Sequence, residues 1–438
     1  MLYSFKLGRN KELSIAELIA VFGSKRIEEY TQDHLLIHAA KPVTQEVFNR
    51  LGGSIKVSQV LFEKAENELV DTITEVILKN SDIDSKITYA INIEPISQGS
   101  KKLLKNLLSN IKKSLKTHKA KVRFINKLGK DGAKNIENIQ SKKEILDKEN
   151  CIEINLLKKG STYLVSHLVA SQDIENYSKR DYEKPKRDTV NGMLPPKLAQ
   201  ILINLSLNGQ NSLEPQRIKD ITITDPFCGS GGVIMEALLM GFHAIGSDLN
   251  PKMISDTKEN INWLRTHYDI HKKQNCIAFT HDATQRFPKA KKQGIIATEG
   301  YLGEPMGRYP NEEAIHRNFS HIKKLYKDFF KNASHMYSHA LIAICIPNYI
   351  QKNQVREPKD LIKQIEALGF TLLPLIPKNV NAQHHILKKG DTLQTYLYKR
   401  PDQIVGRRIC VFKRNTPETS VQKKKTSHHS KSTRQGSR

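Results

Sequence analysis

The feature that most constrains the fold is a glycine-rich turn between two apolar runs, within residues 221–251. The first run, "ITITD", ends at Asp225, the turn "PFCGSGG" opens a helical segment, and the second run ends at Asp248. Glycines let a backbone approach a ligand closely, and a carboxylate at the end of the second strand can hold ribose hydroxyls. Ligands of such sheets bind beyond the carboxyl ends of the strands. This segment therefore predicts an α/β sheet that binds a nucleoside-containing cofactor.

The residues of the turn narrow the choice of cofactor. No lysine follows the glycines, so the phosphate-binding pattern GxxxxGK[ST] is absent, and the turn also lacks the GxGxxG spacing of dinucleotide sites. Asp225 precedes the glycines instead, and a carboxylate suits the cationic sulfonium and amino groups of S-adenosylmethionine better than an anionic pyrophosphate. Cys228 lies in the turn without an evident base partner, so we interpret it as a small packed side chain. The predicted cofactor is S-adenosylmethionine, and no metal site is expected.

Apolar runs and helix-length segments alternate over residues 196–415. A helix is predicted at residues 196–207. The predicted strands are 221–225, 243–248, 276–281, 294–299 and 340–347. Strands separated by helices are typical of a doubly wound, mostly parallel sheet. We therefore expect a Rossmann-like α/β domain in this part of the chain.

The N-terminal part of the chain predicts two smaller α+β units, at residues 1–60 and 61–170. The helix of the first unit has Ser14 and Glu17 in capping-box spacing and ends at Gly23. In the second unit, a helix at residues 101–117 carries an apolar stripe that we expect to be buried, and strands precede and follow it.

Two segments lack the patterns of regular structure. Residues 171–195 mix charged residues with Pro and Gly without periodicity, so we interpret them as a linker between domains. Residues 416–438 have almost nothing to bury and predict a disordered basic tail.

Positive charge is concentrated in one segment. The net charge is +25. Residues 101–150 hold 15 Lys/Arg against 5 Asp/Glu, whereas residues 1–100 hold 11 against 14. A local excess of this kind is expected where a protein binds a polyanion, although a solvated lysine-rich face explains the charge equally well. The candidate RNA-binding residues are Lys105, Lys112, Lys113, Lys116, Lys121 and Arg123.

The cysteines and the apolar runs indicate the class of protein. The five cysteines lie far apart without a CxxC pair, which favours neither a disulfide framework nor a zinc ribbon. Lys6 and Arg9 stand where a signal peptide needs apolar residues, and the longest apolar stretch, "ALIAICI", is too short to span a bilayer. We expect a soluble cytoplasmic protein that does not bind membranes.

Three segments, "RDTVNGMLPPKLAQILINL", "DPFCGSGGVIMEALLMG" and "YLYKRPDQIVGRRICVF", resemble the tRNA guanosine-10 N2-methyltransferase family. The start of the chain, "YSFKLGRNKELSIAELIAVFG", is similar to that family too. The resemblance covers about residues 1–415. It implies an N-terminal ferredoxin-like part at residues 1–60, a THUMP RNA-binding domain at 61–170 and a Rossmann-like class I methyltransferase domain.

The same resemblance implies roles for individual residues. It places the methionine end of the cofactor at Asp225, Gly229 and Gly231, with Phe227 and Ser230 of the same turn completing the set. Asp248 would bind the ribose and Asp282 the adenine. A strand-end cap is the alternative interpretation of Asp282, and Asn250 followed by Pro251 is interpreted as a helix N-cap.

The segment "TEGYLGEP", residues 298–305, stands where the family has an acidic or amide residue, two prolines and an aromatic residue. An exocyclic amine needs acceptors for its N–H groups and an aromatic surface to hold its base. The match places these roles on the carboxylate of Glu299, the carbonyl of Gly300 and the ring of Tyr301. Glu reaches roughly 1.5 Å further than Asp, and Gly300 replaces a proline that would stiffen the turn. The alternatives are a surface carboxylate for Glu299 and ordinary packing for Tyr301.

These features predict an enzyme that transfers a methyl group from S-adenosylmethionine to the N2 amine of a guanosine in tRNA. The first alternative is an amino-methyltransferase that acts on rRNA or on an adenine or cytosine amine, including one in DNA. The second is a non-catalytic RNA-binding protein with a degenerate target-base segment. The sequence leaves open the modified nucleotide, the number of methyl groups, the oligomeric state and the need for a small activator subunit, which some relatives of the family require.

Overall fold

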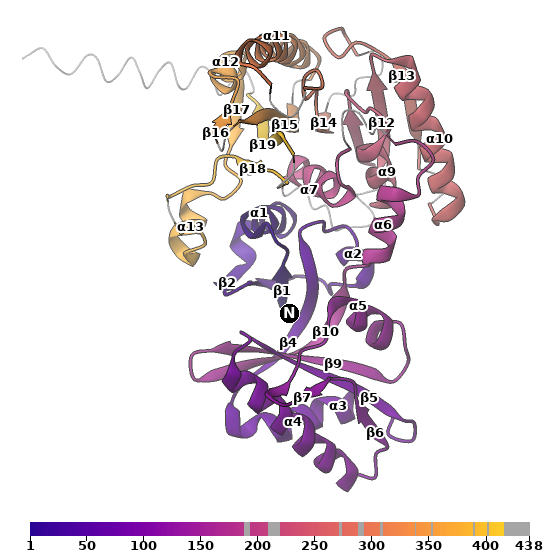
Figure 1. The fold of residues 1–438 in the computed structure, drawn as a ribbon, viewed down its shortest axis with the longest axis vertical. Helices are drawn as coiled ribbons and strands as arrows, with labels where there is room; N and C mark the ends of the chain where they lie inside the picture. The colour runs from indigo at the N-terminus through magenta and orange to yellow at the C-terminus, as the bar shows by residue number, and fades with distance from the viewer. Residues whose placement is uncertain are drawn as a thin grey trace, which may run out of the picture. The chain divides into compact units, whose positions relative to one another are not determined.

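The computed structural model describes residues 1–187, 193–208, 220–270, 274–287, 293–306, 310–337, 339–351, 354–388, 390–400 and 403–415. The predicted basic tail, residues 416–438, lies outside the described residues. The chain divides into two compact units, Met1–Lys179 with His384–Ile386, and Arg180–Gln383 with Leu387–Arg438 (Figure 1). Across the described residues, no helix combines the length and apolar character needed to cross a bilayer.

The first unit is built on one eight-stranded sheet with the order β2-β3-β1-β4-β10-β9-β5-β6. Its strands are β1 (Leu2–Leu7), β2 (Ile27–Thr31), β3 (His34–His38), β4 (Ser54–Ala65), β5 (Ile87–Glu94), β6 (Val122–Phe124), β9 (Cys151–Lys159) and β10 (Thr162–Ser171). Strand β5 is parallel to both of its neighbours, and the other neighbouring pairs are antiparallel. The predicted boundary near residue 60 falls inside β4, which pairs with β1 on one side and with β10 on the other. The two predicted α+β units therefore share a sheet.

Helices α3 (Leu69–Lys79) and α4 (Gln98–Thr117) pack on the part of this sheet that contains β5 and β9. The residues of α4 that are fully buried are Leu104, Leu107, Leu108, Ile111 and Leu115. They recur at the spacing of one helix face, so the buried stripe predicted for this helix is confirmed. The unit also contains α1 (Lys11–Phe22), α2 (Gln45–Phe48), α5 (Asn138–Gln140) and the short pair β7 (Leu128–Gly129) and β8 (Gly132–Ala133).

The predicted capping box at the start of α1 is wrong. The N-cap is Asn10, and Ser14 and Glu17 lie inside the helix. The Ser14 hydroxyl donates to the carbonyl of Gly53 at 2.7 Å, and the Glu17 carboxylate accepts the backbone N–H groups of Gly52 (2.9 Å) and Gly53 (2.8 Å). Both side chains bind a turn that is distant in sequence, and such a contact produces no local pattern. The predicted helix end at Gly23 is confirmed.

The second unit contains a sheet with the order β13-β12-β11-β14-β15-β19-β17, in which β16 also pairs with β15 and β18 with β19. The strands are β11 (Thr222–Asp225), β12 (His243–Asp248), β13 (Cys276–Thr280), β14 (Gln293–Thr298), β15 (His339–Gln351), β16 (Gln354–Arg356), β17 (Phe370–Leu373), β18 (Tyr396–Tyr398) and β19 (Val405–Arg414). Strands β13, β12, β11, β14 and β15 are parallel, and β19 runs antiparallel to β15. The predicted doubly wound, mostly parallel α/β fold is confirmed.

In the described part of the second unit, the helices are α6 (Ile174–Tyr182, which begins in the first unit), α7 (Pro196–Leu207), α9 (Gly232–Leu239), α10 (Pro251–His267), α11 (Glu312–Met336), α12 (Leu361–Ala367) and α13 (Lys378–His384). One face of α11 is buried in an apolar cluster with residues of β14, β15, β17 and β19. Helix α7 packs against α9 and against β14 and β15.

Part of the predicted linker is a helix anchored by a buried ion pair. Arg180, on α6, donates to Glu236 on α9 through Nε at 2.6 Å and Nη2 at 3.2 Å. Gln200 also donates to this carboxylate, at 2.8 Å. The sequence analysis interpreted this segment as an irregular linker because the partner of Arg180, Glu236, lies 56 residues away and leaves no local pattern. Residues 188–192 of the predicted linker lie outside the described residues.

Candidate functional site

The glycine turn between β11 and α9 leaves space above its backbone. Gly229 and Gly231 have positive φ angles of 51° and 88°, a conformation that favours glycine. A Cβ added at Gly229 would meet no described atom within 4 Å, whereas one at Gly231 would lie 3.0 Å from Cγ2 of Thr257 on α10. The turn therefore leaves Gly229 accessible to close approach and packs Gly231 against the next helix.

The other residues of the turn are packed into the unit. The ring of Phe227 lies 5.4 Å from the ring of Phe329 on α11, centroid to centroid. Cys228 is buried, as predicted, and burial raises the pKa of its thiol. Ser230 is nearly buried, and its carbonyl accepts from Nδ2 of Asn260 at 2.8 Å. Among the predicted cofactor residues, Phe227 and Ser230 thus fix the shape of the turn.

Asp248 connects the end of β12 to the glycine turn. Its Oδ2 accepts the N–H of Gly229 at 3.0 Å, and its Oδ1 accepts the N–H of Asn250 at 2.9 Å. Asn250 is the N-cap of α10, where its side chain accepts from the N–H of Lys252 at 3.0 Å, and Pro251 is the first residue of the helix. The N-cap prediction is therefore confirmed. The carboxylate of Asp248 remains partly exposed beside the turn.

The carboxyl group of Asp225 is buried at the end of β11, with an exposed fraction of 2%. Its pKa is raised to about 7, chiefly by burial and also by the nearby charges of Asp248 and Glu299. The Thr298 hydroxyl and the N–H of Phe227, which donates at 3.1 Å, act in the opposite direction. A cation placed beside this carboxyl would favour its ionised form.

Thr298 joins the glycine turn to the predicted target-base segment. It is the last residue of β14 and is fully buried. Its hydroxyl lies close enough to the Asp225 carboxyl to lower the pKa of that group, and it accepts the N–H of Gly300 at 3.0 Å. Strands β11 and β14 are adjacent, at the point where the strand order of the sheet reverses, which is where such sheets bind ligands. The hydroxyl therefore brings the two predicted subsites together, and the sequence interpretation gave it no role.

Two glycines let the segment after β14 pass close to two tyrosine hydroxyls. Gly300 has a φ of 72°, and a Cβ there would lie 2.2 Å from the hydroxyl oxygen of Tyr326. Gly303 has a φ of 95°, and a Cβ there would lie 2.2 Å from the hydroxyl oxygen of Tyr349. A proline could not replace Gly300, because its ring fixes φ near −65°. The glycine is thus required by the path of the backbone.

The same hydroxyls hold this segment in place. The Tyr326 hydroxyl lies 3.1 Å from the carbonyl of Tyr301 and 3.0 Å from the carbonyl of Cys345, two acceptors that share its one hydrogen. Tyr349 donates to the carbonyl of Leu302 at 2.9 Å. Both tyrosines belong to the core of the unit, on α11 and β15. Our expectation that a segment without the proline loses stiffness therefore needs correction, because tertiary hydrogen bonds restrain the backbone instead.

The Tyr301 side chain is half-buried against the core cluster that also contains Phe227. Burial raises the pKa of its hydroxyl. Its ring centroid lies 5.6 Å from that of His321 on α11, with the two planes inclined by 57°. The packing interpretation of Tyr301 thus describes one side of the ring, and its stacking role stays a prediction.

Glu299 forms an ion pair with Arg407, a residue of β19 that the sequence interpretation missed. The Nε of Arg407 donates to Oε1 of Glu299. The side chains are 19% exposed for Glu299 and 3% for Arg407. Arg407 also donates from Nη1 to Oε1 of Gln403, at 3.2 Å. The surface-carboxylate interpretation of Glu299 is therefore wrong. The available signal was the arginine pair in the otherwise apolar run "GRRICVF".

Asp282 follows β13 and forms a local turn. Its Oδ1 accepts from the N–H of Thr284 at 2.9 Å and from the Thr284 hydroxyl at 2.8 Å, as in the alternative interpretation of a strand-end cap. The preceding residue, His281, donates its N–H to the carbonyl of Asp248 at 3.0 Å. Asp282 thus directly follows a residue that is hydrogen-bonded to Asp248. The role of Asp282 in binding adenine stays a prediction.

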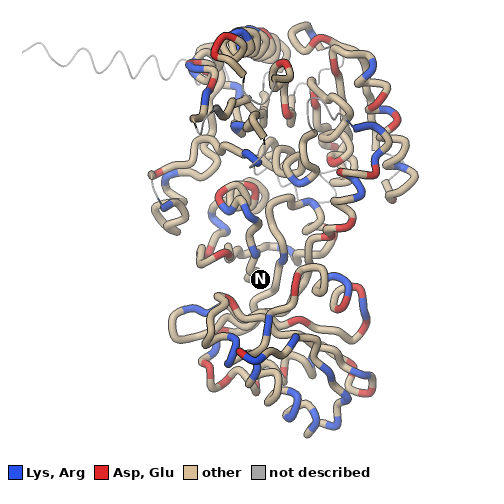
Figure 2. The backbone as a smooth tube through the Cα atoms, viewed as in Figure 1, with Lys and Arg blue, Asp and Glu red and all other residues tan. Residues whose placement is uncertain are grey.

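The predicted RNA-binding residues lie on α4 and the strand that follows it, within the first unit. Lys105, Lys113, Lys116, Lys121 and Arg123 are exposed. Lys112 is half-buried, and its ammonium group lies over the ring of Phe124 at 5.6 Å from the centroid. Figure 2 shows lysine and arginine along this part of the first unit.

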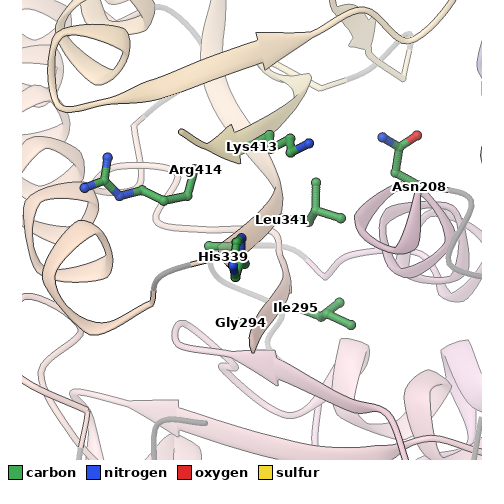
Figure 3. A pocket seen from close by; sticks show the side chains of 8 residues that line it. Asn208, Gly294, Ile295, His339, Leu341, Lys413 and Arg414 are labelled. Carbon is green, nitrogen blue, oxygen red and sulfur yellow. The ribbon is translucent and has the colours of Figure 1, made fainter. Parts of the chain in front are cut away.

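A cavity of about 310 Å³ lies at the end of the second sheet that is opposite to the glycine turn. It is lined by the amino ends of β14 and β15 and by the end of β19. Figure 3 shows Lys413 extending toward Asn208 and Arg414 extending away from it. None of the predicted site residues lines this cavity, so the cavity and the candidate site are separate.

Comparisons with known proteins identify relatives. A family profile described as "DNA methylase" matches residues 61–259, and one described as "RMKL-like, methyltransferase domain" matches residues 185–359. A tRNA (guanine(10)-N2)-dimethyltransferase of Methanothermobacter thermautotrophicus is 27% identical over 174 residues, which is 40% of this chain and 44% of the relative. The enzyme of the same name from Methanocaldococcus jannaschii is 28% identical over 281 residues, 58% of this chain and 68% of the relative. The chain is thus similar in sequence to these tRNA methyltransferases.

The solved structure of TrmN from Thermus thermophilus matches 94% of this chain and 99% of its own, with 13% identity and a TM-score of 0.46. The similarity to tRNA (guanine(10)-N2)-dimethyltransferases that the sequence predicted is confirmed by the sequence relatives, whereas the THUMP assignment stays a prediction. The profile that matches residues 185–359 contains the glycine turn, Asp248, Asp282 and Glu299. Arg407 lies beyond both family profiles.

Proposed function

We propose that this protein transfers a methyl group from S-adenosylmethionine to the N2 amine of a guanosine in tRNA. The observation that carries the proposal is the position of the Thr298 hydroxyl, which accepts the N–H of Gly300 of the target-base segment and lies close enough to Asp225 of the glycine turn to lower its pKa. One residue thus connects the two subsites that a methyl transfer needs. The two relatives, both tRNA (guanine(10)-N2)-dimethyltransferases, support this choice of substrate and amine.

The residues at the glycine turn fit this cofactor. The space above Gly229 allows close approach of a ligand, and the buried Asp225 carboxyl matches a positively charged group. Asp248, at the end of β12, would hold ribose hydroxyls, and Asp282 the adenine. When bound, S-adenosylmethionine supplies a methyl group on a cationic sulfur, which makes it an electrophile.

The target-base segment would hold the amine in line for transfer. The lone pair of an exocyclic amine is delocalised into its ring, so the enzyme must accept the N–H hydrogens and fix the nitrogen. Glu299 would accept one N–H, the carbonyl of Gly300 would accept the other, and Tyr301 would stack on the base. The hydrogen bonds from Tyr326 and Tyr349 would keep this arrangement rigid before the base arrives.

The first unit would bind the RNA. Five of the six candidate residues on α4 and the following strand are exposed, and lysine and arginine near phosphates release condensed counterions. We assign a THUMP-like role to residues 61–170 on this basis and expect the enzyme to act in the cytoplasm.

A transfer assay tests the proposal. Purified protein is incubated with tritium-labelled S-adenosylmethionine and, separately, with bulk tRNA, bulk rRNA and DNA, each with and without a cell extract that can supply an activator subunit. We expect label in the tRNA alone, recovered as N2-methylguanosine or N2,N2-dimethylguanosine after digestion. Label in rRNA or DNA would identify that nucleic acid as the substrate in place of tRNA. No label in any arm would favour a non-catalytic RNA-binding protein.

A further inference from the structure

The Glu299–Arg407 ion pair is the clearest feature of the site that the proposed roles do not explain. We propose that Arg407 is a positioning residue, which holds the Glu299 carboxylate as an anion at the place where it accepts the N–H of the target amine. This inference rests on the proposed function. It also explains why the segment has Glu where the resembled family has an acidic residue one methylene shorter or an amide.

The ion pair spans a strand of the sheet. Glu299 follows β14, Arg407 belongs to β19, and β15 lies between these two strands. Neighbouring strands are separated by about 4.8 Å, so the backbones of β14 and β19 are about 10 Å apart. Arg407 pairs with Pro347 of β15, and Thr298, just before Glu299, pairs with Ile344. Two long side chains are therefore needed to meet above β15.

The residue beneath the pair on β15 is small. Cys345 is fully buried, and both Glu299 and Arg407 act on it electrostatically. Burial raises the pKa of its thiol, which therefore stays neutral beside the two charges. A larger side chain at this position would occupy the path between Glu299 and Arg407.

The ion pair offsets the negative charge that gathers at this edge of the sheet. The described titratable groups that interact electrostatically with Glu299 include Asp225, Tyr326, Cys345, Lys184 and Arg407. Two of these groups are cations, Lys184 and Arg407. Burial lowers the pKa of Lys184, so Lys184 loses its charge more readily than Arg407 does. Arg407 keeps its charge: burial alone would lower its pKa, but the charge and hydrogen bond of Glu299 hold it above the ordinary value. A guanidinium does not lose its proton in a protein, so Arg407 is the permanent partner of the carboxylate.

The geometry of the guanidinium fixes a direction as well as a charge. Its Nε donates to Glu299 while its Nη1 donates to Gln403 at 3.2 Å, so two bonds set the orientation of one rigid plane. A lysine would supply the charge but not this fork. An aspartate at position 299 would fall roughly 1.5 Å short of the guanidinium, since it has one methylene fewer.

The test compares Arg407→Gln and Arg407→Lys with Arg408→Gln. Arg408, the next residue of β19, pairs with the half-exposed Glu357 at 2.8 Å and provides a matched control. For Arg407→Gln we expect kcat for tRNA methylation to fall about 100-fold, the loss typical of a reacting group displaced by about 1 Å. We also expect the acidic limb of its pH–rate profile to move to higher pH, because the anion has lost its permanent partner. Arg407→Lys should lose less activity and keep the wild-type acidic limb, and Arg408→Gln should behave as wild type.

Cofactor affinity and the thermal midpoint of unfolding are measured for every variant. Normal S-adenosylmethionine affinity together with the kinetic changes would support the inference. The inference is overturned if both Arg407 variants retain the wild-type kcat and pH profile. It is also overturned if they lose cofactor binding and fold stability in proportion to kcat. In both cases the proposed function stands. A wild-type protein that labels no nucleic acid overturns both. If Arg407→Gln fails to fold, Arg407→Lys replaces it in the test because it keeps the charge. A lower kcat with unchanged cofactor affinity would then support the inference, and an unchanged kcat would overturn it.

Discussion

The charged residues of the two units differ in burial and in their partners. In the second unit, Asp225 and Glu299 are largely buried, and specific groups bind their carboxyl oxygens. In the first unit, Lys105, Lys113 and Lys116 lie on the exposed side of α4. A buried charge depends on one particular partner, so its removal has a large and specific effect. Exposed lysines act together, at longer range, and salt screens them.

Burial of charge does not by itself mark a reactive site. The first unit has a buried pair of its own, in which Nζ of Lys56 lies 3.1 Å from Oε1 of Glu153. Asn92 donates to the same carboxylate at 2.8 Å. Each of these residues lies inside a strand, on β4, β5 or β9, and none stands beyond the end of its strand. What distinguishes Glu299 is its place beyond the end of β14, next to the glycine turn.

The largest expected effect is that of Glu299→Ala. Loss of the acceptor should lower the rate of methyl transfer by about 100- to 1000-fold, as when one preorganised hydrogen-bonding group is removed from an active site. Cofactor affinity should change little, because Glu299 does not belong to the glycine turn. Label incorporation and equilibrium dialysis measure the two quantities. The control is Glu304→Ala, an exposed acid of the same segment; equal labelling by the Glu299 and Glu304 variants would remove Glu299 from the mechanism.

Gly300→Ala tests the rigidity of the segment. The new Cβ would meet the hydroxyl of Tyr326 at 2.2 Å and would force a non-glycine residue to a φ of 72°. We expect the free energy of unfolding to fall by about 2–4 kcal/mol, measured by urea denaturation. In the first unit, Gly160→Ala is the matched control, since its φ is 58° but no described atom lies within 4 Å of the added Cβ. It should lose only about 1 kcal/mol, and a similar loss for both variants would contradict the steric argument.

Asp225 links cofactor binding to pH. Its pKa of about 7 lies above that of an unfolded aspartate, so the folded protein retains a proton that the unfolded chain releases near pH 4. Asp225 therefore contributes less to the stability of the cofactor-free protein as pH rises through this window. A cationic ligand favours the ionised form, so S-adenosylmethionine affinity should rise about tenfold per pH unit up to about pH 7 and then level off. Titration calorimetry from pH 5.5 to 8.5 measures this; a wild-type slope as flat as that of Asp225→Asn would exclude the linkage.

The smallest effect per residue is expected in the first unit. Changing Lys105, Lys113 and Lys116 to Gln should weaken tRNA binding and reduce its salt slope by about 2, because each lysine accounts for roughly 0.7–0.9 of the slope. The rate at saturating tRNA should be unaffected. Filter binding at several salt concentrations provides the measurement, with the exposed Lys79→Gln on α3 as control. A triple variant with an unchanged slope would remove this face of α4 from the RNA interface.

Local patterns determined much of the fold and part of the site. The alternation of strands and helices predicted the parallel sheet, and the apolar stripe of α4 predicted its buried face, because both signals depend on spacing along one element. The glycines and the carboxylates at strand ends were predicted for the same reason. The turn at Gly229 and Gly231 needs glycine wherever the rest of the chain lies.

Contacts between distant segments decided what the sequence could not. Thr298, Arg407 and Tyr326 shape the target-base segment, and each acts on a partner that only the sheet order or the packing of α11 brings near. Ser14 and Glu17 misled the sequence analysis because their partners lie more than thirty residues away. The sequence by itself thus determined which elements form and which residue types stand at the strand ends. Only the tertiary structure decided the partners of the buried polar groups, because satisfying a buried charge or hydroxyl requires atoms that folding alone brings within hydrogen-bonding distance.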